Sequence, residues 1–259
     1  MTAEKADAVS VRLSDVPYEV FYLPVTDSTN TRLKAWHRGE ALQGVHGGLK
    51  HGVCLAAGCQ TAGRGRLGRS FLSPGGGLYF SLYLTCASPV EAMGVTAPAA
   101  AAVCAALWDL GFEGAMVKWV NDIWYRNRKV CGILCEYVDG AVICGVGINM
   151  MPPRGGYPPE AGPAGALGRA DLEWTDLLRA VLLRMDAFLK DRSAALDFYR
   201  AHQYLRGKSV TVAVGSREKR GTALDVDGEF RLVLRDEDGS IQTLNCGEVT
   251  RVRMADHEG

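Results

Sequence analysis

The chain has 259 residues, in which 29 basic and 29 acidic side chains give a formal net charge of zero. This balance gives no general attraction to nucleic acid or to an anionic membrane, so a local basic segment favours a small anionic ligand over a polyanion. No apolar run reaches the length of a membrane span, and the first residues lack the apolar core of a signal peptide. We therefore expect a cytoplasmic protein without a membrane partner.

Strand-like and helical segments alternate in the first half of the chain. The apolar runs that predict strands lie at residues 20–23, 53–57 and 78–84. After the first of them, candidate N-caps at residues 27–29 predict the start of a helix. The alanine-rich segment at residues 96–110 predicts a second helix, which ends at Gly111.

Strands joined by tight turns are predicted in the middle of the chain, followed by a long loop and helices. These strands lie at residues 116–119, 123–125, 130–137 and 141–148. Asn127-Arg128 and Asp139-Gly140 stand where hairpin turns are expected. Residues 151–168 are rich in proline and glycine and predict a loop long enough to have a function. Residues 174–204 carry apolar side chains at helical spacing and predict two helices.

The pattern changes at Arg206 to short strands with Asp-Gly turns, which predicts a small β-barrel. We therefore expect an α+β fold with two domains. Residues 1–205 form a mixed, largely antiparallel sheet with flanking helices, and residues 206–259 form the barrel. The eight cysteines lie mostly in apolar segments without zinc-site spacing. We expect them to be reduced and to pack as small hydrophobic side chains.

A glycine-rich loop with three arginines, which we call the arginine loop (residues 60–73), stands before an apolar strand. It places Arg64, Arg66 and Arg69 close together. Glycines let backbone N–H groups turn toward a ligand, and guanidinium groups are forked donors suited to phosphate and carboxylate. Its GxGxxG pattern is followed by a strand rather than a helix, and the chain lacks the HRD and DFG motifs of a kinase. The loop therefore indicates an anionic ligand and neither a Rossmann fold nor a kinase.

Two further polar groups follow the arginine loop. Asn121 and Asp122 lie between two predicted strands, where a role in the turn explains them equally well. Lys129 leaves a predicted hairpin, where an edge lysine with its charge in solvent is the simpler interpretation. Asn149 ends a strand, where an asparagine is also unremarkable. Taken singly, none of these residues decides a function.

Five segments taken together resemble the catalytic domain of the biotin protein ligases. In the order of that family they are TDSTN, QTAGRGRLGRSFLSP, KWVNDI, RKVCGILCE and GVGINM. The tail GEVTRVRM resembles the end of the small C-terminal barrel of the family, so the resemblance extends over residues 20–254. The family's usual proline in KWPND is Val120 here, which bears on the rigidity of that turn more than on the chemistry.

The resemblance implies a class II synthetase-like catalytic domain followed by an SH3-like barrel. It implies ATP-dependent activation of biotin to biotinyl-5′-AMP with Mg²⁺, and transfer of biotin to a lysine of the biotin carboxyl carrier protein of acetyl-CoA carboxylase or a related enzyme. Larger members of the family carry an N-terminal DNA-binding module. Fewer than twenty residues precede the first predicted strand here, so we expect no DNA partner. A monomer and a homodimer both remain open.

The site residues implied by the resemblance fall into three groups. The implied catalytic residues are Arg66, Lys129 and Asp122. The implied biotin-binding residues are Ser28, Thr29, Asn30, Gln60, Gly63, Arg64, Gly65, Arg66, Lys129 and Gly132. The implied ATP- and adenylate-binding residues are Arg64, Arg66, Arg69, Phe71, Asn121, Asp122 and Asn149. Mg²⁺ is expected to be bound through the phosphates rather than in a fixed cage of protein ligands.

Two other functions compete with biotin ligation. A lipoate or octanoate ligase has the same general fold, but its acyl chain calls for an apolar slot with less need of the polar residues at 28–30 and of Gln60. A non-catalytic biotin sensor would retain the pocket, whereas the presence of both Arg66 and Lys129 favours turnover. Nucleic-acid binding is the least favoured alternative, since the chain lacks a broad basic face.

Overall fold

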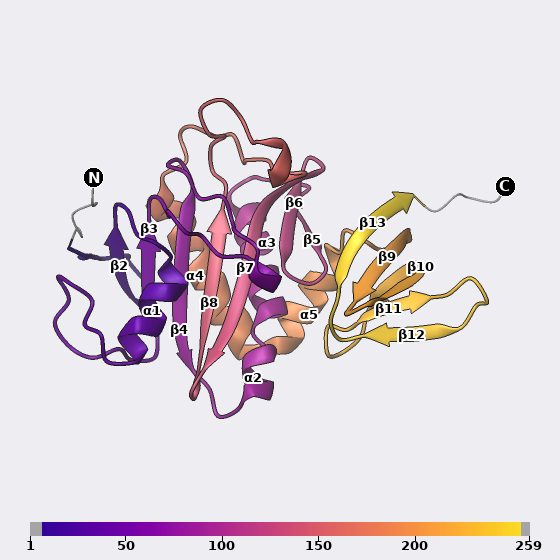
Figure 1. Cartoon of the computed structure of the whole chain (residues 1–259), viewed down its shortest axis with the longest axis horizontal. Helices are drawn as coiled ribbons and strands as arrows, with labels where there is room; N and C mark the ends of the chain where they lie inside the picture. The colour runs from indigo at the N-terminus through magenta and orange to yellow at the C-terminus, as the bar shows by residue number, and fades with distance from the viewer. Residues whose placement is uncertain (1–6, 255–259) are drawn as a thin grey trace.

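The computed structural model describes residues 7–254, which form two units with separate β-sheets (Figure 1). The larger unit contains an eight-stranded sheet in the order β1-β2-β3-β4-β8-β7-β6-β5. Its strands are β1 (Val9–Val11), β2 (Glu19–Leu23), β3 (Val53–Ala57), β4 (Leu78–Thr85), β5 (Met116–Lys118), β6 (Asp122–Tyr125), β7 (Arg128–Val138) and β8 (Ala141–Ile148). Only β2 and β3 pair in parallel. The expected α+β fold with a mixed, largely antiparallel sheet is confirmed.

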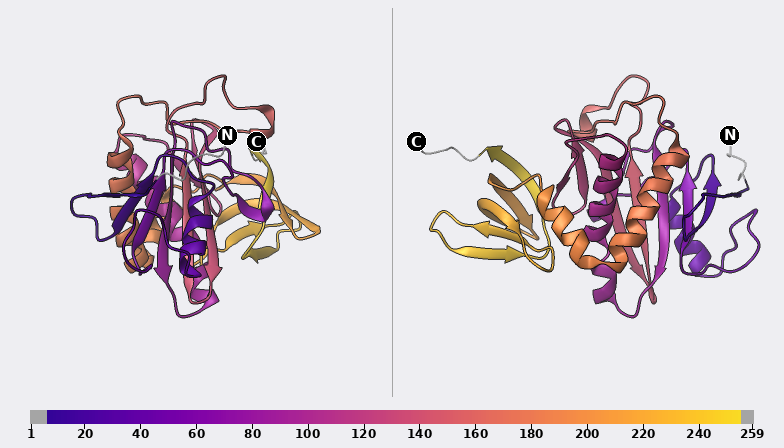
Figure 2. Two further views of the ribbon diagram at one scale, coloured as in Figure 1. Left: turned by 60° about the vertical axis from the view of Figure 1, so that its left-hand side comes forward. Right: turned by 180° about the vertical axis from the view of Figure 1, so that it is seen from behind.

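Helices cover both faces of this sheet. One face carries α1 (Thr29–His37), which connects β2 to β3, and such a crossover is what a parallel pair requires. The opposite face is covered by α3 (Thr96–Asp109), α4 (Trp174–Lys190) and α5 (Arg192–Ala201), which lie together in the right-hand view of Figure 2. A short helix, α2 (Pro89–Met93), precedes α3.

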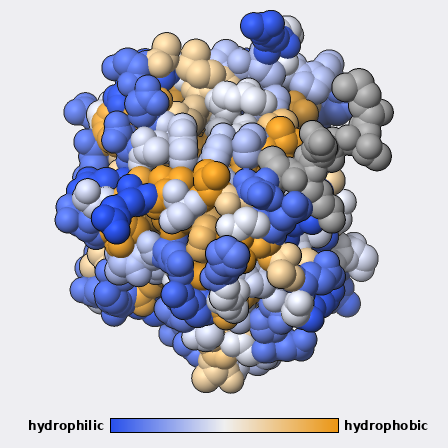
Figure 3. Space-filling model, turned by 90° about the vertical axis from the view of Figure 1, so that its left-hand side faces the viewer, coloured by the Kyte–Doolittle hydropathy of each residue, from blue (hydrophilic) through white to orange (hydrophobic). Residues whose placement is uncertain are grey.

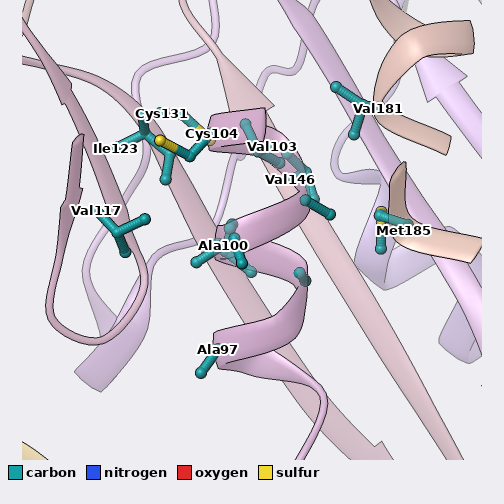
Figure 4. Packing of buried hydrophobic residues seen from close by; sticks show 14 of the residues in the cluster. Ala97, Ala100, Val103, Cys104, Val117, Ile123, Cys131, Val146, Val181 and Met185 are labelled. Carbon is teal, nitrogen blue, oxygen red and sulfur yellow. The ribbon is translucent and has the colours of Figure 1, made fainter. Parts of the chain in front are cut away.

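The central helix α3 is buried on almost every side. Every residue from Ala97 to Leu107 is buried, and Figure 4 shows Ala100 and Cys104 among side chains from several other elements. Alanine has the highest helix propensity, and its small side chain lets a helix lie close to its neighbours. The segment Pro89–Asp109 has the length and apolar composition of a membrane span, contrary to our expectation, but 72% of the tested window is buried inside the protein. It is therefore a core helix.

The turns and the first strand refine the predictions from sequence. The hairpin between β6 and β7 turns at Arg126 and Asn127, whose positive φ angles of 50° and 59° place the turn one residue before the predicted pair. The edge strand β1 was not predicted, because it has only three residues and none is buried.

Viewed from the β1 side, the surface carries a band of hydrophobic residues among hydrophilic ones (Figure 3).

The smaller unit is a five-stranded antiparallel sheet in the order β12-β11-β10-β9-β13. Its strands are β9 (Lys208–Val214), β10 (Arg217–Val226), β11 (Leu232–Arg235), β12 (Ile241–Leu244) and β13 (Glu248–Met254). This confirms the small β-structured unit, while the boundary at residues 205 and 206 stays a prediction. The indole Nε1 of Trp119 donates a hydrogen bond of 2.9 Å to the carbonyl of Phe230 and so links the two units.

We expect Ala100→Leu to lower the free energy of unfolding by about 1–3 kcal/mol, because the added methyl groups have no space around this fully buried position. Denaturant unfolding measures the change. Val90→Leu is the control, since Val90 is 72% exposed and a larger side chain there should change stability by less than about 0.5 kcal/mol. Equal effects of the two substitutions would contradict the packing described for α3.

Candidate functional site

One cavity brings together most of the residues singled out in the sequence. It lies over the face of the large sheet that carries α1, between the arginine loop, the edge strands and the start of β13. The predicted residues that line it are Ser28, Thr29, Asn30, Gln60, Arg64, Gly65, Arg66, Arg69, Phe71, Asn121, Asp122, Lys129 and Gly132. Gly63 and Asn149 do not line it. Segments far apart in the chain therefore form a single site.

The first turn of α1 forms the polar end of the cavity. Ser28 is the N-cap of α1, and its extended backbone directs Thr29 and Asn30 into the protein, where both are buried. The backbone N–H of Thr29 donates a hydrogen bond of 2.9 Å to Oε1 of Gln60. Nε2 of Gln60 in turn donates to Oγ of Ser73 at 2.9 Å. These hydrogen bonds fix which atoms of the amide groups accept and which donate.

Ser81 completes this polar network, although the sequence analysis did not select it. It is fully buried in β4, and its Oγ lies within hydrogen-bond distance of two atoms, Oγ1 of Thr29 at 2.7 Å and Oδ1 of Asn30 at 2.5 Å; the amide oxygen of Asn30 can only accept, so it takes the hydroxyl proton. The signal in the sequence is a single hydroxyl within the apolar run LYFSLYL, since a buried hydroxyl requires a partner. The polar end of the cavity is thus neutral and pre-organised.

Glu136 connects the polar network to the arginine loop. It accepts hydrogen bonds from Nδ2 of Asn30 at 2.8 Å and from Lys34 at 2.5 Å, and it pairs with Arg64 at 3.0 Å. Burial alone would raise the pKa of this carboxyl, but the hydrogen bonds from Asn30 and Lys34 and the nearby positive charges outweigh it and hold the pKa below its ordinary value. Glu136 is therefore ionised at neutral pH.

The backbone of the arginine loop is held in a compact turn. The N–H of Gly65 donates to the carbonyl of Arg69 at 2.7 Å, and that of Phe71 to the carbonyl of Gly63 at 2.9 Å. A Cβ at Gly63 would overlap the carbonyl oxygen of Phe71, so glycine is required by this close approach. Leu67 at the tip of the turn is 76% exposed.

Each arginine of the loop has a partner within the protein. Besides Arg64, which pairs with Glu136, Arg66 donates to Oδ1 of Asn121 at 2.8 Å and to the carbonyl of Gly247 at 3.2 Å. Arg69 forms a two-pronged ion pair with Glu248. These hydrogen bonds from Arg69 lower the pKa of Glu248. The small unit therefore supplies partners for two of the three arginines.

Lys129 and Asp122 lie on the neighbouring strands β7 and β6, and their side chains form an ion pair. Nζ of Lys129 is 2.8 Å from the buried Oδ1 of Asp122, and this ion pair is the one polar contact of that oxygen in the described part of the chain. The loop at residues 151–168 holds Lys129 in place, because the backbone N–H of Lys129 donates to the carbonyl of Pro163 at 2.8 Å and its carbonyl accepts from Gly165 at 2.9 Å. This long loop therefore positions a residue of the site.

Asn149 helps to hold the same loop, residues 151–168, in place. Its Nδ2 donates to the carbonyl of Gly165 at 2.8 Å, and its backbone N–H donates to the carbonyl of Val130 at 2.8 Å. The side chain is buried and holds the loop against the end of β8. Its expected part in binding ATP stays a prediction.

Phe71 lies on a part of the sheet that has no side chains. Gly132 and Gly147 are direct neighbours on β7 and β8. A Cβ added to Gly147 would lie 2.6 Å from the ring of Phe71, and one added to Gly132 would lie 3.0 Å from it. The two glycines therefore make room for an aromatic ring on the sheet surface.

Lys118 also lines the cavity, although no role was assigned to it from the sequence. Its Nζ lies 4.7 Å from the ring centre of Trp124 and donates a long hydrogen bond of 3.5 Å to the carbonyl of Val249. Burial lowers the pKa of Lys118. Within residues 7–254, no group of three His, Cys, Asp or Glu side chains is arranged to hold a metal ion.

Comparisons with known proteins agree with this geometry. The model of the biotin/lipoate A/B protein ligase family matches residues 22–150, and that of the biotin protein ligase C terminal domain matches residues 206–251. The biotin–[acetyl-CoA-carboxylase] ligase of Mycobacterium tuberculosis is 31% identical over 240 residues, which cover 88% of this chain and 87% of that protein. This chain belongs to the biotin protein ligase family.

A second relative and two solved structures extend the comparison. The bifunctional ligase/repressor BirA of Escherichia coli is 30% identical over 246 residues, or 89% of this chain and 73% of BirA. The biotin protein ligase of Aquifex aeolicus in complex with biotin and ATP is 28% identical with a TM-score of 0.75, over 91% of this chain and 99% of that one. The Leishmania major ligase is 19% identical with a TM-score of 0.56, over 88% and 98%, and supports the fold alone.

Glu136→Gln should lower the free energy of unfolding by about 1–3 kcal/mol at neutral pH, because the variant leaves Lys34 and Arg64 without a negative charge. The folded pKa of Glu136 is below its ordinary value of 4.5, so its contribution is complete above that pH and is lost as the pH falls below it. The difference between wild type and variant should therefore shrink from pH 6 to pH 3.

Denaturant unfolding over this pH range measures the difference, and Glu237→Gln is the control because no ion pair involving Glu237 is present among the described residues. A difference that stays constant as the pH falls would contradict an ionised Glu136 at the centre of this network.

Proposed function

We propose that this chain activates biotin with ATP to biotinyl-5′-AMP and then transfers the biotin to a lysine of a carboxylase carrier protein. The observation that carries the proposal is that one cavity contains both a neutral polar end and a cluster of cations. The neutral end suits the uncharged polar ring of biotin. The cations suit its carboxylate and the phosphates of ATP. The Aquifex relative binds these two molecules together in its solved structure.

The neutral end suits the ureido ring of biotin. Asn30, Thr29 and Gln60 offer donors and acceptors whose orientation is already fixed by one another and by Ser81. A neutral ring bound by neutral groups leaves no unpaired charge in the buried pocket. We assign the biotin ring to this end and its carboxylate to the end that carries Arg66 and Lys129.

The first step joins two anions. A carboxylate oxygen of biotin attacks the α-phosphorus of ATP, a phosphorus–oxygen bond forms, and the bond to the leaving pyrophosphate breaks. Arg66 and Lys129 would each neutralise charge that builds up on the phosphate oxygens, and they would hold the two repelling anions in line. Arg69 would bind the outer phosphates, and Phe71 would stack near the adenine.

In the second step, the neutral amine of the acceptor lysine attacks the acyl carbon of the adenylate. A carbon–nitrogen bond forms, the bond to the phosphate oxygen breaks, AMP leaves, and the amine loses a proton. No nucleophilic residue of the enzyme is required, since ATP has already activated the carboxylate. The arginine loop would shield the reactive anhydride from water until the acceptor arrives.

Asp122 fits a role in binding Mg²⁺. Its buried Oδ1 has the ion pair with Lys129 as its one polar contact among the described residues, and a carboxylate oxygen is a preferred ligand of this ion. Phosphate oxygens and water would complete the coordination, in keeping with the lack of a three-residue metal cluster within residues 7–254. Bound Mg²⁺ would add charge neutralisation at the phosphates.

The two competing functions are less well supported. A lipoate ligase has no need for the hydrogen-bonded set around Ser81, and the C-terminal match is to a biotin protein ligase domain. A sensor without turnover does not need the five basic side chains that line the cavity, Arg64, Arg66, Arg69, Lys118 and Lys129. We propose a cytoplasmic location, because all eight cysteines lie in the described part of the chain and are free thiols. A monomer and a homodimer are both consistent with the proposal.

Pyrophosphate should be released from ATP and Mg²⁺ only when biotin is present, and Arg66→Ala and Lys129→Ala should each lower that rate at least about a hundredfold, or about 2.7 kcal/mol. Neither side chain belongs to the hydrophobic core, so the fold should persist, with a loss of stability of at most about 1–3 kcal/mol from the hydrogen bonds of Arg66 and the ion pair of Lys129. Arg38→Ala, an exposed arginine at the end of α1, is the control with normal activity.

Two results would contradict the proposal. Absence of biotin-dependent pyrophosphate release from folded wild-type protein would favour the sensor or the lipoate ligase. A large fall in melting temperature with near-normal turnover in the two variants would show that Arg66 and Lys129 are structural.

A further inference from the structure

One outer face of the small unit carries arginines that the proposed reaction does not use. Because side chains alternate along a strand, every second residue of β9, β10 and β13 lies on the same side of the sheet. The buried side includes Val210, Val212 and Ala223. The opposite side carries a set that we call the arginine face: Ser209, Thr211, Arg220, Thr222, Arg235, Arg251 and Arg253.

The register of the strands places these residues in two adjacent rows. In one row, Thr211 lies between Arg220 and Arg251. In the next row, Ser209 and Thr222 lie between Arg235 and Arg253. Each row therefore has an arginine at either end and hydroxyl groups in the middle. The set lines a shallow depression, so its members are neighbours in space as well as in register.

Of the four arginines on this face, Arg220 alone forms an ion pair within residues 7–254, with Glu218 at 3.1 Å. Among the described residues, no carboxylate pairs with Arg235, Arg251 or Arg253, and all three are exposed. The acidic residues at its border are Glu218, Asp236 and Glu237. Asp236 is already engaged, since it accepts hydrogen bonds from Ser240 and Gln242 within its own turn. Exposed arginines without partners on a neutral chain are suited to a partner of opposite charge.

The arginine face begins where the active-site cavity ends. Glu248 opposes Ala213, and Arg251 opposes Thr211, two residues along β9, so Glu248 and Arg251 share a side of the sheet. Glu248 lines the cavity and forms the ion pair with Arg69 of the arginine loop. A molecule whose reactive group enters the cavity from this side would therefore lie over Arg251 and Arg253.

We propose that the arginine face docks the acceptor protein, through acidic side chains that flank its target lysine. This inference rests on the proposed function, because only a macromolecular acceptor must extend beyond the cavity. Arg251 and Arg253 are two residues apart on one strand, or about 7 Å, which matches acidic residues at positions i and i+2 of an extended segment. The partner that fits is thus an acidic extended segment next to a lysine.

A protein partner suits this face better than a nucleic acid. A polynucleotide presents phosphates in a long row, whereas these four arginines occupy only two rows of one small sheet. The hydroxyl groups between the arginines add donors and acceptors for carboxylates and for backbone groups of the partner.

The test separates docking from activation. In the double variant Arg251→Glu/Arg253→Glu, biotin-dependent pyrophosphate release and the trapping of the adenylate by hydroxylamine should remain normal. Transfer of biotin to the carrier domain of an acetyl-CoA carboxylase should fall at least about tenfold in kcat/KM at low salt, mainly through KM. The defect should shrink at high salt, because screening weakens the repulsion that the glutamates introduce.

Lys219→Glu is the matched control. It makes the same reversal of charge at a single position on β10, one residue from Arg220 and on the other side of that strand, and it should leave transfer unchanged. Replacing acidic residues beside the carrier's lysine by lysine should weaken transfer by the wild-type enzyme and restore part of the transfer by the double variant.

Three results would overturn the inference. Normal transfer by the double variant is one, and an equal loss with Lys219→Glu is another. The third result would show that the face binds nucleic acid. In that case a single-stranded oligonucleotide inhibits transfer by the wild type, the double variant no longer binds the oligonucleotide, and the double variant uses the carrier with normal kinetics. If the wild type releases no pyrophosphate, the proposed function fails instead. The docking surface is then tested by measuring directly how tightly the carrier binds to the wild type and to the double variant.

Discussion

The guanidinium of Arg66 joins the two units of this protein at the candidate functional site. It donates to Asn121 on the large unit and to the carbonyl of Gly247 on the small one. The small unit therefore contributes to the candidate site directly. The same is true of Glu248, which neutralises Arg69. Any change that separates the two units would also remove the partners of the arginine loop.

A second constraint follows from the charges. Cations gathered around a cavity repel one another, and here each has a partner within the protein, from Glu136 at one end to Asp122 at the other. A bound carboxylate or phosphate would have to replace these partners, so the free energy of binding is a difference between two sets of ion pairs. Because ion pairs are exchanged, the affinity of this end of the cavity depends on the charge of the ligand. The neutral ring of biotin is recognised instead by the hydrogen-bond network around Ser81.

Local patterns in the sequence predicted much of the fold and many of the residues that gather at the site. The arginine loop, KWVNDI and RKVCGILCE carry their chemistry in contiguous segments, which is why they were recognised. Ser81, Glu136 and Glu248 were given no role, although Glu136 ends RKVCGILCE, because each gains its role only through partners distant in the chain. Asn149 shows the reverse case: its side chain is bonded to Gly165 of the supporting loop and does not line the cavity.

Thermal unfolding with ligands tests the central claim, that one cavity activates biotin with ATP, most directly. Melting temperature would be measured with Mg²⁺ and biotin, with Mg²⁺ and ATP, and with all three. Ligands that bind the folded state stabilise it by mass action, and an adenylate that contacts both ends of the cavity would bind more tightly than either substrate. The account predicts that the rise with biotin and ATP together exceeds the sum of the separate rises. A rise no larger than that of ATP alone would contradict it.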